Sequence, residues 1–309
     1  MINIRPFLNT DPPALAEVIN RCCKIESAVS SSLLEHAVFS KIYFTNDRLL
    51  IATRNQRTVG FVHLGSTDSD DHDNSTLTIS NLLFDEGDLE TATALVNAAS
   101  EFANKLGFQR LRIGSSPENA EYYNGISSHF LNVGIPDFQH VLPVLYSIGF
   151  YEIAAWLCFE READTARLPF RREHMLYRRS HDVVQVIDPV FDSSAINLVF
   201  SHLANSELRL IERDTNSVLG RLVYASLAHS YPGWPSGGID VLSYIPQNNS
   251  TPIQVFDYLI SELVRQTPES GLSPLRVQVS ESNEPYCELL LTLGFCNRIR
   301  SVHLALDLH

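Results

Sequence analysis

The side chains with the most reactive chemistry, the cysteines and histidines, do not occur at spacings that build reactive sites. The chain has five cysteines and eleven histidines. The odd number of cysteines and the lack of a Cys-x-x-Cys pair argue against a disulfide framework and favour buried free thiols in a reducing compartment. The histidines form neither His-Glu-x-x-His nor a His–Cys ligand pattern, so we expect no metal site.

A polar stretch rich in aromatic residues, 117–136, indicates the binding of a small molecule instead. Tyr122, Tyr123 and His129 lie in it. Loops on a rigid scaffold often carry recognition, so these three side chains are predicted to line a substrate pocket. The alternative is that they cover an edge of a sheet.

Length and charge limit the classes of protein to consider. The chain has 309 residues, which favours two domains, and a formal net charge of −13, which argues against binding to nucleic acid. An acidic surface suits a cationic or amine partner, although solubility explains it equally well. Neither a signal peptide nor an apolar run of about 20 residues is present, so we expect a cytoplasmic protein that does not enter the membrane.

The elements that must position any site occur twice. A strand, a polar turn and a second strand are predicted at 50–62 and again at 210–223; another strand and a long amphipathic helix follow each hairpin. A further strand, a short helix and a last strand complete each copy. The further strands are predicted at 110–113 and 275–279, and the last strands at 153–159 and 301–306.

Both short helices end in Gly-Phe, at Gly149-Phe150 and Gly294-Phe295. Glycine there is typical of a helix end that enters the left-handed region. The repeat predicts an α/β protein of two tandem domains, 1–168 and 169–309, each with a mixed central sheet flanked by helices. We refer to these ranges as the first and second halves.

Three local predictions concern helix ends and the segment between the halves. Asp11 is predicted to cap a helix that starts with Pro12, and Ser32 to open a capping box. The basic segment 167–179 is predicted to be a solvated or interdomain face.

This order of elements resembles the GNAT superfamily of acyl-CoA-dependent N-acyltransferases in its tandem-domain form, of which mycothiol synthase is one example. The resemblance covers nearly the whole chain. It rests on that order and on segments that match the superfamily's motifs: 4–6, 58–63, 80–84, the two Gly-Phe endings, and 279–283 with the helix that follows. It implies a sheet whose two central strands splay apart to hold acyl-CoA, with the diphosphate at the start of the next helix.

The two predicted diphosphate loops differ from the superfamily's glycine-rich pattern. In the first half the loop 85–90 has four carboxylates around one glycine, which would repel a diphosphate. In the second half the loop 246–253 is neutral, and its amides, hydroxyls and backbone N–H groups can receive phosphates. The alternative for this loop is a helix that caps itself through Thr251 and Gln254. The residues predicted to bind acetyl-CoA are Leu242, Ser243, Tyr244, Ile245, Asn249, Ser250, Thr251, Ile253 and Asn283.

The resemblance also implies an acid–base pair for transfer to an amine. Asp240, on the strand before the neutral loop, is the candidate base; the alternative is a surface carboxylate at a sheet edge. Tyr286 is the candidate acid, one helical turn before the superfamily's tyrosine position, which holds Leu290 here. A core tyrosine is the alternative for Tyr286, and a helix N-cap is the alternative for Asn283.

Two functions follow as hypotheses. The first is an acyltransferase that moves an acetyl or acyl group from acyl-CoA, bound by the second half, to an amine of a small molecule or peptide. The rival is a catalytically inactive relative that senses acyl-CoA or serves as an interaction module. The altered loops and the displaced tyrosine favour the rival; the neutral second loop and Asp240 favour the enzyme.

Overall fold

In the computed structural model the strands of the described residues form one continuous sheet. The structure describes residues 1–23, 28–65, 75–114, 122–123, 133–137, 139–163, 168–191, 194–227, 237–247 and 252–308. The main strand order is β1-β2-β3-β4-β5-β13-β7-β12-β11-β10-β9-β8. This mixed sheet flanked by helices confirms the predicted fold class, and no helix in these ranges is both long and apolar enough to span a membrane.

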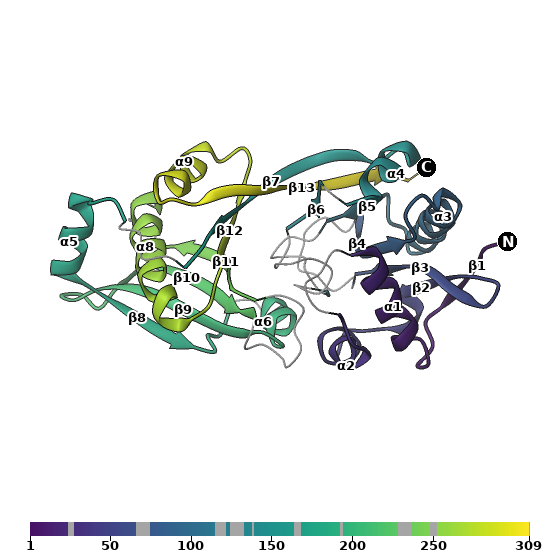
Figure 1. Ribbon diagram of the computed structural model, residues 1–309, viewed down its shortest axis with the longest axis horizontal. Coiled ribbons are helices and arrows are strands. Elements are labelled where there is room, and N and C mark those ends of the chain that lie inside the picture. Colours follow the sequence, from purple (N-terminus) through teal and green to yellow (C-terminus); the bar gives the residue numbers. More distant parts are fainter. Residues whose placement is uncertain are drawn as a thin grey trace.

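The first half carries one copy of the repeat, at the right of Figure 1. Its strands are β1 (Asn3–Pro6), β2 (Leu49–Arg54), β3 (Arg57–Leu64), β4 (Thr76–Phe84), β5 (Arg110–Ile113), β6 (Ile135–Pro136) and β7 (Tyr151–Arg161). Its helices are α1 (Pro12–Cys22), α2 (Ser31–Leu34), α3 (Leu89–Lys105) and α4 (Val141–Ile148), with a π-helical turn at Glu35–Phe39 and a 3-10 turn at Asn46–Arg48.

The second half repeats this order at the left of Figure 1. Its strands are β8 (His181–Ile187), β9 (Ala204–Glu212), β10 (Val218–Ser226), β11 (Ile239–Pro246), β12 (Leu275–Ser280) and β13 (Cys296–Asp307). Its helices are α5 (Arg172–Ser180), α6 (Ser194–Phe200), α8 (Pro252–Ser270) and α9 (Glu284–Thr292). The basic helix α5 packs on α8, where Arg171 Nη1 lies 2.9 Å from Asp257 Oδ2. Arg171 and Arg178 therefore bind within the second half, whereas Arg172 and Arg179 are exposed, as predicted for a solvated face.

The last strands of the two copies are exchanged between the halves. β7 and β13 run antiparallel to each other along the upper side of Figure 1. β13 then pairs with β5 of the first half, with Leu304 opposite Ile113. β7 pairs with β12 of the second half, with Trp156 opposite Ser280. Each part of the sheet is therefore completed by a strand from the other copy, and the division of the chain into domains stays a prediction.

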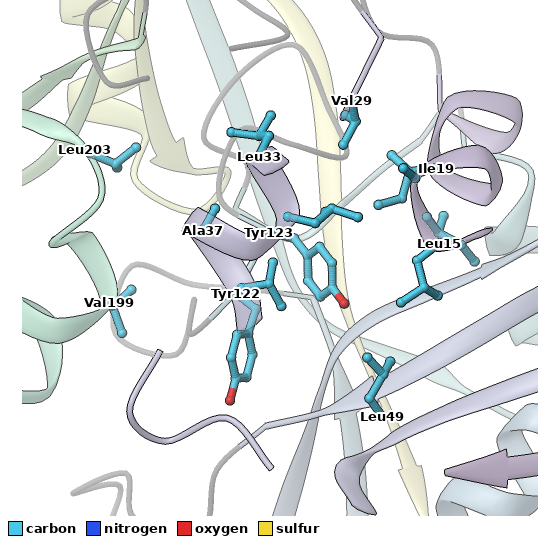
Figure 2. Packing of buried hydrophobic residues seen from close by; sticks show 14 of the residues in the cluster. Leu15, Ile19, Val29, Leu33, Ala37, Leu49, Tyr122, Tyr123, Val199 and Leu203 are labelled. Atoms are coloured by element: carbon cyan, nitrogen blue, oxygen red, sulfur yellow. The ribbon is translucent and has the colours of Figure 1, made fainter. Parts of the chain in front are cut away.

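The helices bury the two faces of the sheet in three apolar clusters. One lies under α3 and α4 and a second under α8 and α9. The third combines both halves: residues of α1 and α2, such as Leu15 and Leu33, pack in one cluster with Val199 and Leu203 of the second half (Figure 2). Since apolar burial is the main force that holds folded elements together, this shared cluster joins the halves.

Helix ends follow the predictions only in part. Gly149 and Gly294 have φ of 110° and 83°, and the next residues, Phe150 and Phe295, donate backbone hydrogen bonds into the last turn, which confirms the predicted ends. Asp11 precedes α1 but makes no side-chain cap bond, because Arg5 and the Leu8 N–H hold its carboxylate. The cap of α2 is Ser30, which accepts from Leu33 N at 3.1 Å, and not Ser32.

Gly220 sets how closely α8 approaches the sheet. A Cβ at this position would lie 2.6 Å from Val255 Cγ1 and 3.3 Å from the ring of Tyr244. We expect Gly220→Ala to destabilise the protein by about 1–3 kcal/mol, since overpacking moves neighbouring atoms. Urea unfolding measures this loss. The Gly220→Ala/Val255→Ala double variant should lose less than the two single variants together; simple additivity would contradict this packing explanation.

Candidate functional site

The two central strands of each copy splay apart, as the resemblance implies. In the second half β11 and β12 pair in parallel only at Ile239–Leu275 and Asp240–Arg276, although β11 continues to Pro246. In the first half β4 and β5 pair up to Ile79–Ile113, and β4 continues to Phe84. A strand edge that loses its neighbour presents backbone donors and acceptors to an extended ligand.

A β-bulge marks the start of each splay. On β11 the register with β10 shifts so that Leu242 has no partner residue, and on β4 the register with β3 shifts so that Ser80 has none. Because an extra residue bends and twists its strand, the bulges direct β11 and β4 away from their parallel neighbours. The two halves therefore build the same opening with different side chains.

The predicted acetyl-CoA residues of β11 lie along this opening. Leu242 is buried in the shared cluster, and Ser243, Tyr244 and Ile245 are half-buried. The Tyr244 hydroxyl donates to the Pro252 carbonyl oxygen at 2.6 Å, so the ring lies beside the first turn of α8. Ile253, in that turn, is half-buried against the α8 cluster. Asn249, Ser250 and Thr251 lie outside the described residues, so the self-capping alternative stays open.

Tyr286 lies in the first turn of α9, directly after β12. Its ring centroid is 5.1 Å from that of Phe256 on α8, and Phe256 is 5.2 Å from Tyr244. The half-buried Tyr286 therefore stands with Tyr244 at the splayed ends of β11 and β12, although it also packs on the core as the alternative proposes. Burial raises the pKa of Tyr286, so the phenol keeps its proton at neutral pH, as a proton donor must.

Asn283 occupies the N-cap position of α9, which confirms the position given by the alternative prediction. Its backbone carbonyl accepts from Tyr286 N and Cys287 N, each at 3.2 Å. The side chain makes no capping hydrogen bond and is exposed. Its amide is therefore available to a ligand at the end of β12.

Asp240 is not a surface carboxylate, so that alternative is wrong. It is 2% exposed, and its Oδ1 accepts from Arg276 Nη1 at 3.0 Å in the last paired row before the splay. Arg276 also donates to the Gly237 carbonyl at 2.9 Å, and its Nε lies 3.3 Å from Glu160 Oε2. Burial acts to lower the pKa of Arg276, but the carboxylates of Asp240 and Glu160 outweigh it and raise that pKa. The ion pair between Asp240 and Arg276 therefore holds β11 and β12 together in the row where the opening starts.

In the first half the start of α3 is capped and ion-paired by its own side chains. The Asp88 carboxylate caps α3, accepting from Thr91 N at 3.1 Å and Thr91 Oγ1 at 2.7 Å. Arg54 Nη2 lies 3.0 Å from both Asp88 and Glu90. Although burial acts to raise it, the hydrogen bonds from Arg54 and Thr91 hold the pKa of Asp88 below its usual range. The N–H donor at the start of α3 that a phosphate would use is thus engaged.

Tyr122 and Tyr123 lie in the shared cluster (Figure 2) and not at a sheet edge. Tyr123 Oη is 3.1 Å from His63 Nδ1, and Tyr122 donates to the Tyr43 carbonyl at 3.3 Å. They cover the inner face of β3, so the edge alternative is wrong for them. Their role in substrate binding stays a prediction, and His129 lies outside the described residues.

The sequence contains no pattern that predicts the burial of Lys41 and His63. Lys41 reaches across to the second half, where its Nζ lies 2.9 Å from the Leu198 carbonyl and 3.0 Å from His202 Nδ1. A cation suits the carboxyl end of α6, and burial lowers the pKa of Lys41 to about 8. His63, on β3, is fully buried. A lone lysine or histidine in sequence has no pattern that predicts such a position.

No protein-family model and no curated protein matches this chain. Solved structures do. A tandem GNAT protein from the clavulanic acid biosynthesis pathway, solved without acetyl-CoA, aligns with a TM-score of 0.66 and 13% identity over 100% of this chain and 99% of that one. A GCN5-related N-acetyltransferase from Sphaerobacter thermophilus aligns with a TM-score of 0.62 and 11% identity over 100% and 96%. The glucosamine N-acetyltransferase region of a fungal multi-domain β-N-acetylglucosaminidase aligns with a TM-score of 0.65 and 12% identity over 99% of this chain and 38% of that one.

Proposed function

We propose that this chain, which has the tandem GNAT fold, transfers an acyl group from acyl-CoA to an amine, and that acyl-CoA binds to the second half. The observation that carries the proposal is the opening between β11 and β12, which leaves β11 unpaired on that side from Val241 to Pro246. The pantetheine arm of CoA is an extended chain of amides. It fits an open strand edge by the same hydrogen bonds that add a strand to a sheet.

The contrast between the two helix starts supports the assignment to the second half. α3 begins in carboxylates that already bind its donors, whereas the described part of the loop before α8, Pro246 and Gln247, is neutral, and so are the first residues of α8. A diphosphate is stabilised by the free N–H groups and the positive dipole end of a helix and is repelled by carboxylates. In this proposal the first half does not bind CoA through its diphosphate.

The chemistry proposed is direct attack of the amine on the thioester carbonyl. The C–N bond forms, the C–S bond breaks, and the proton of the amine is lost to solvent or a base; the departing thiolate takes a proton from Tyr286, which regains one from solvent. Asp240 acts here as a positioning residue: its ion pair with Arg276 fixes the last paired row before the opening. The alternative role of Asp240 as the base predicts a much larger loss of activity on substitution.

The rival function, an inactive acyl-CoA sensor or interaction module, shares the same binding site. Binding without turnover would select the rival, and binding with turnover the enzyme. The acceptor is proposed only as an amine of a small molecule or peptide. The similarity to the fungal glucosamine N-acetyltransferase region supports an amine acceptor in general and leaves its identity open.

Titration with acetyl-CoA by calorimetry tests where the cofactor binds. Gln254→Glu places at α8 the carboxylate that α3 has in Glu90. We expect it to weaken acetyl-CoA binding about ten-fold, because a carboxylate and a diphosphate repel each other at contact distance. Gln109→Glu, the same charge change in the first half, is the matched control and should leave binding unchanged. Equal affinities for both variants would contradict the assignment to α8.

Tyr286→Phe tests the proposed proton donor. We expect kcat for acetyl transfer to fall about 10²-fold, with little change in acetyl-CoA affinity, since the ring and its contact with Phe256 are retained. Tyr146→Phe, at an exposed tyrosine of α4, is the control. An unchanged kcat would exclude Tyr286 as the acid.

A further inference from the structure

The sheet ends in two edge strands that occupy corresponding places in the two halves, β1 beside β2 and β8 beside β9. β1 has four residues and ends in Pro6, which has no backbone N–H to donate to a neighbouring strand. β8 has seven residues, contains neither proline nor lysine, and pairs with β9 over its whole length without a register shift. Short length, proline, lysine and bulges protect a sheet edge from further pairing, so β1 is protected and β8 is not.

The edge at β8 is also apolar. Val184 is 41% exposed, Ile187 is 73% exposed, and Val190, shortly after the strand, is 75% exposed. Among the residues that the structure describes, the stretch 170–190 holds more exposed large apolar side chains than any other of its length: Phe170, Met175, Leu176, Val184, Ile187 and Val190. The helix α5, which carries two of them, packs against β8 at the left end of the molecule in Figure 1. Exposed apolar residues gathered in one place are typical of a surface that binds another protein.

Opposite charges lie at the two ends of β8. Arg179 stands at the end of α5, just before the strand, and Asp188 follows the strand directly; both are exposed. Neither forms an ion pair with another described residue, whereas Asp182 pairs with Arg213 at 2.8 Å. An antiparallel strand of the same sequence would bring the acidic end of one copy beside the basic end of the other, and a parallel strand would bring like charges together. The charges therefore favour a second copy of β8, in antiparallel orientation, as the partner.

A two-fold axis limits the register of such a pair. Directly opposed residues of antiparallel strands point to the same face of the sheet, so the axis must pass through one residue, which then lies opposite its own copy. An axis at Gln185 would place Asp182 opposite Asp188, and these two carboxylates repel each other. Val184 is the middle residue of β8, so an axis there pairs all seven residues of each strand. It also brings Arg179 of one copy beside Asp188 of the other, just beyond the last paired row.

We propose that this chain forms a two-fold dimer in which the β8 strands of two copies pair antiparallel about Val184. The sheet of one copy then continues into the other. Such a contact is isologous, so one surface serves both copies and the assembly closes as a dimer. Two strands, β9 and β10, separate β8 from β11, so the dimer leaves the proposed acyl-CoA opening free and does not depend on it. One pair of strands makes a small interface, and we expect a dissociation constant on the order of 50 µM.

Analytical ultracentrifugation of the full-length chain from about 1 to about 300 µM tests the proposal, and we expect the sedimentation coefficient to rise from that of a monomer to that of a dimer. Val184→Lys should keep the chain monomeric throughout, because it sets two ammonium groups opposite each other at the axis. Leu106→Lys, the same change at an exposed residue of the first half, is the matched control and should preserve the dimer. A dimer that persists in Val184→Lys would overturn the proposal. A wild-type chain that stays monomeric would overturn it in favour of a different protein as the partner of β8.

Cross-linking tests the register without the lysine. In a Cys296→Ser background, Val184→Cys should be joined into a covalent dimer by a thiol-specific reagent shorter than about 10 Å, since the two thiols lie opposite each other. Ile187→Cys should not be joined, because its two copies lie six positions apart along the strands, about 20 Å. Cross-linking of Ile187→Cys and not of Val184→Cys would overturn the proposed pairing.

A charge change tests the antiparallel orientation. Arg179→Glu should weaken the dimer about ten-fold, because it sets a carboxylate beside Asp188 of the other copy. Arg172→Glu makes the same charge change at the other end of α5, where the residue is also exposed, and should leave the dissociation constant unchanged. Equal dissociation constants for the two variants would overturn the antiparallel arrangement.

Discussion

Asp240→Asn is expected to destabilise the protein by about 3–5 kcal/mol, because it leaves the buried Arg276 guanidinium with only the more exposed Glu160 as a charged partner. Asp240 and Arg276 have side chains 2% and 4% exposed, and the nearest other carboxylate, Glu160, lies 3.3 Å from Arg276 Nε. Urea unfolding measures the loss. Asp307→Asn is the matched control, since Asp307 pairs with Arg110 at 2.8 Å with both side chains about half exposed; it should cost less than about 1 kcal/mol.

The same variant separates the two roles considered for Asp240. A positioning residue predicts lost stability, with acetyl transfer at low temperature reduced only as far as the opening is distorted. A general base predicts instead a kcat lower by about 10²–10⁴-fold in the protein that remains folded. A stable, inactive Asp240→Asn would thus contradict the role assigned here and restore the base.

Separating the two halves is expected to reduce the stability of the fold more than any substitution. Residues 1–168 expressed alone lack β13, which pairs with both β5 and β7, and residues 169–309 lack β7, which pairs with β12. We expect neither fragment to unfold cooperatively by itself and the two together to recover a cooperative transition, since strand edges and core surface are left exposed in each.

Circular dichroism of the fragments, singly and mixed, makes this measurement. Coexpression of the two fragments is the control for the break in the chain itself. A cooperative transition in residues 1–168 alone would show that the predicted first domain is independent, and that the exchange of β7 and β13 contributes little to its stability.

The sequence predicts the repeat because each copy has strong local patterns. Alternating apolar residues at 50–62 and 210–223 form hairpins, and the two Gly-Phe endings form the predicted left-handed turns. The predicted strand 110–113 matches β5 in both bounds. The likeness to tandem GNAT structures over the whole chain confirms the fold that the resemblance implied.

The exchange of strands could not be predicted, because it is a choice between equivalent partners. β7 and β13 each follow a Gly-Phe helix end and each can close either copy; the hydrophobic pattern does not distinguish the two arrangements.

The partners of buried polar side chains could not be predicted for a similar reason. Arg276 lies far from Asp240 in sequence, and Arg5 competes with helix α1 for Asp11 through a contact that local capping rules do not contain.

The two halves have diverged at corresponding positions. At the start of the helix, carboxylates in α3 correspond to neutral residues in α8; at the bulge, Ser80 corresponds to Leu242. Such differences on one backbone plan are what the proposed binding of acyl-CoA to the second half, and not to the first, requires. The fold itself, shared by both halves, does not decide between them.

Hydrogen exchange of the full-length chain with and without acetyl-CoA tests the central claim most directly. Bound cofactor should slow exchange at the first turn of α8, residues 253–256, and along β11 at 242–245, while the first turn of α3, residues 89–92, exchanges as before. Protection at α3 in place of α8, or no protection anywhere at saturating acetyl-CoA, would contradict an acyl-CoA site in the second half.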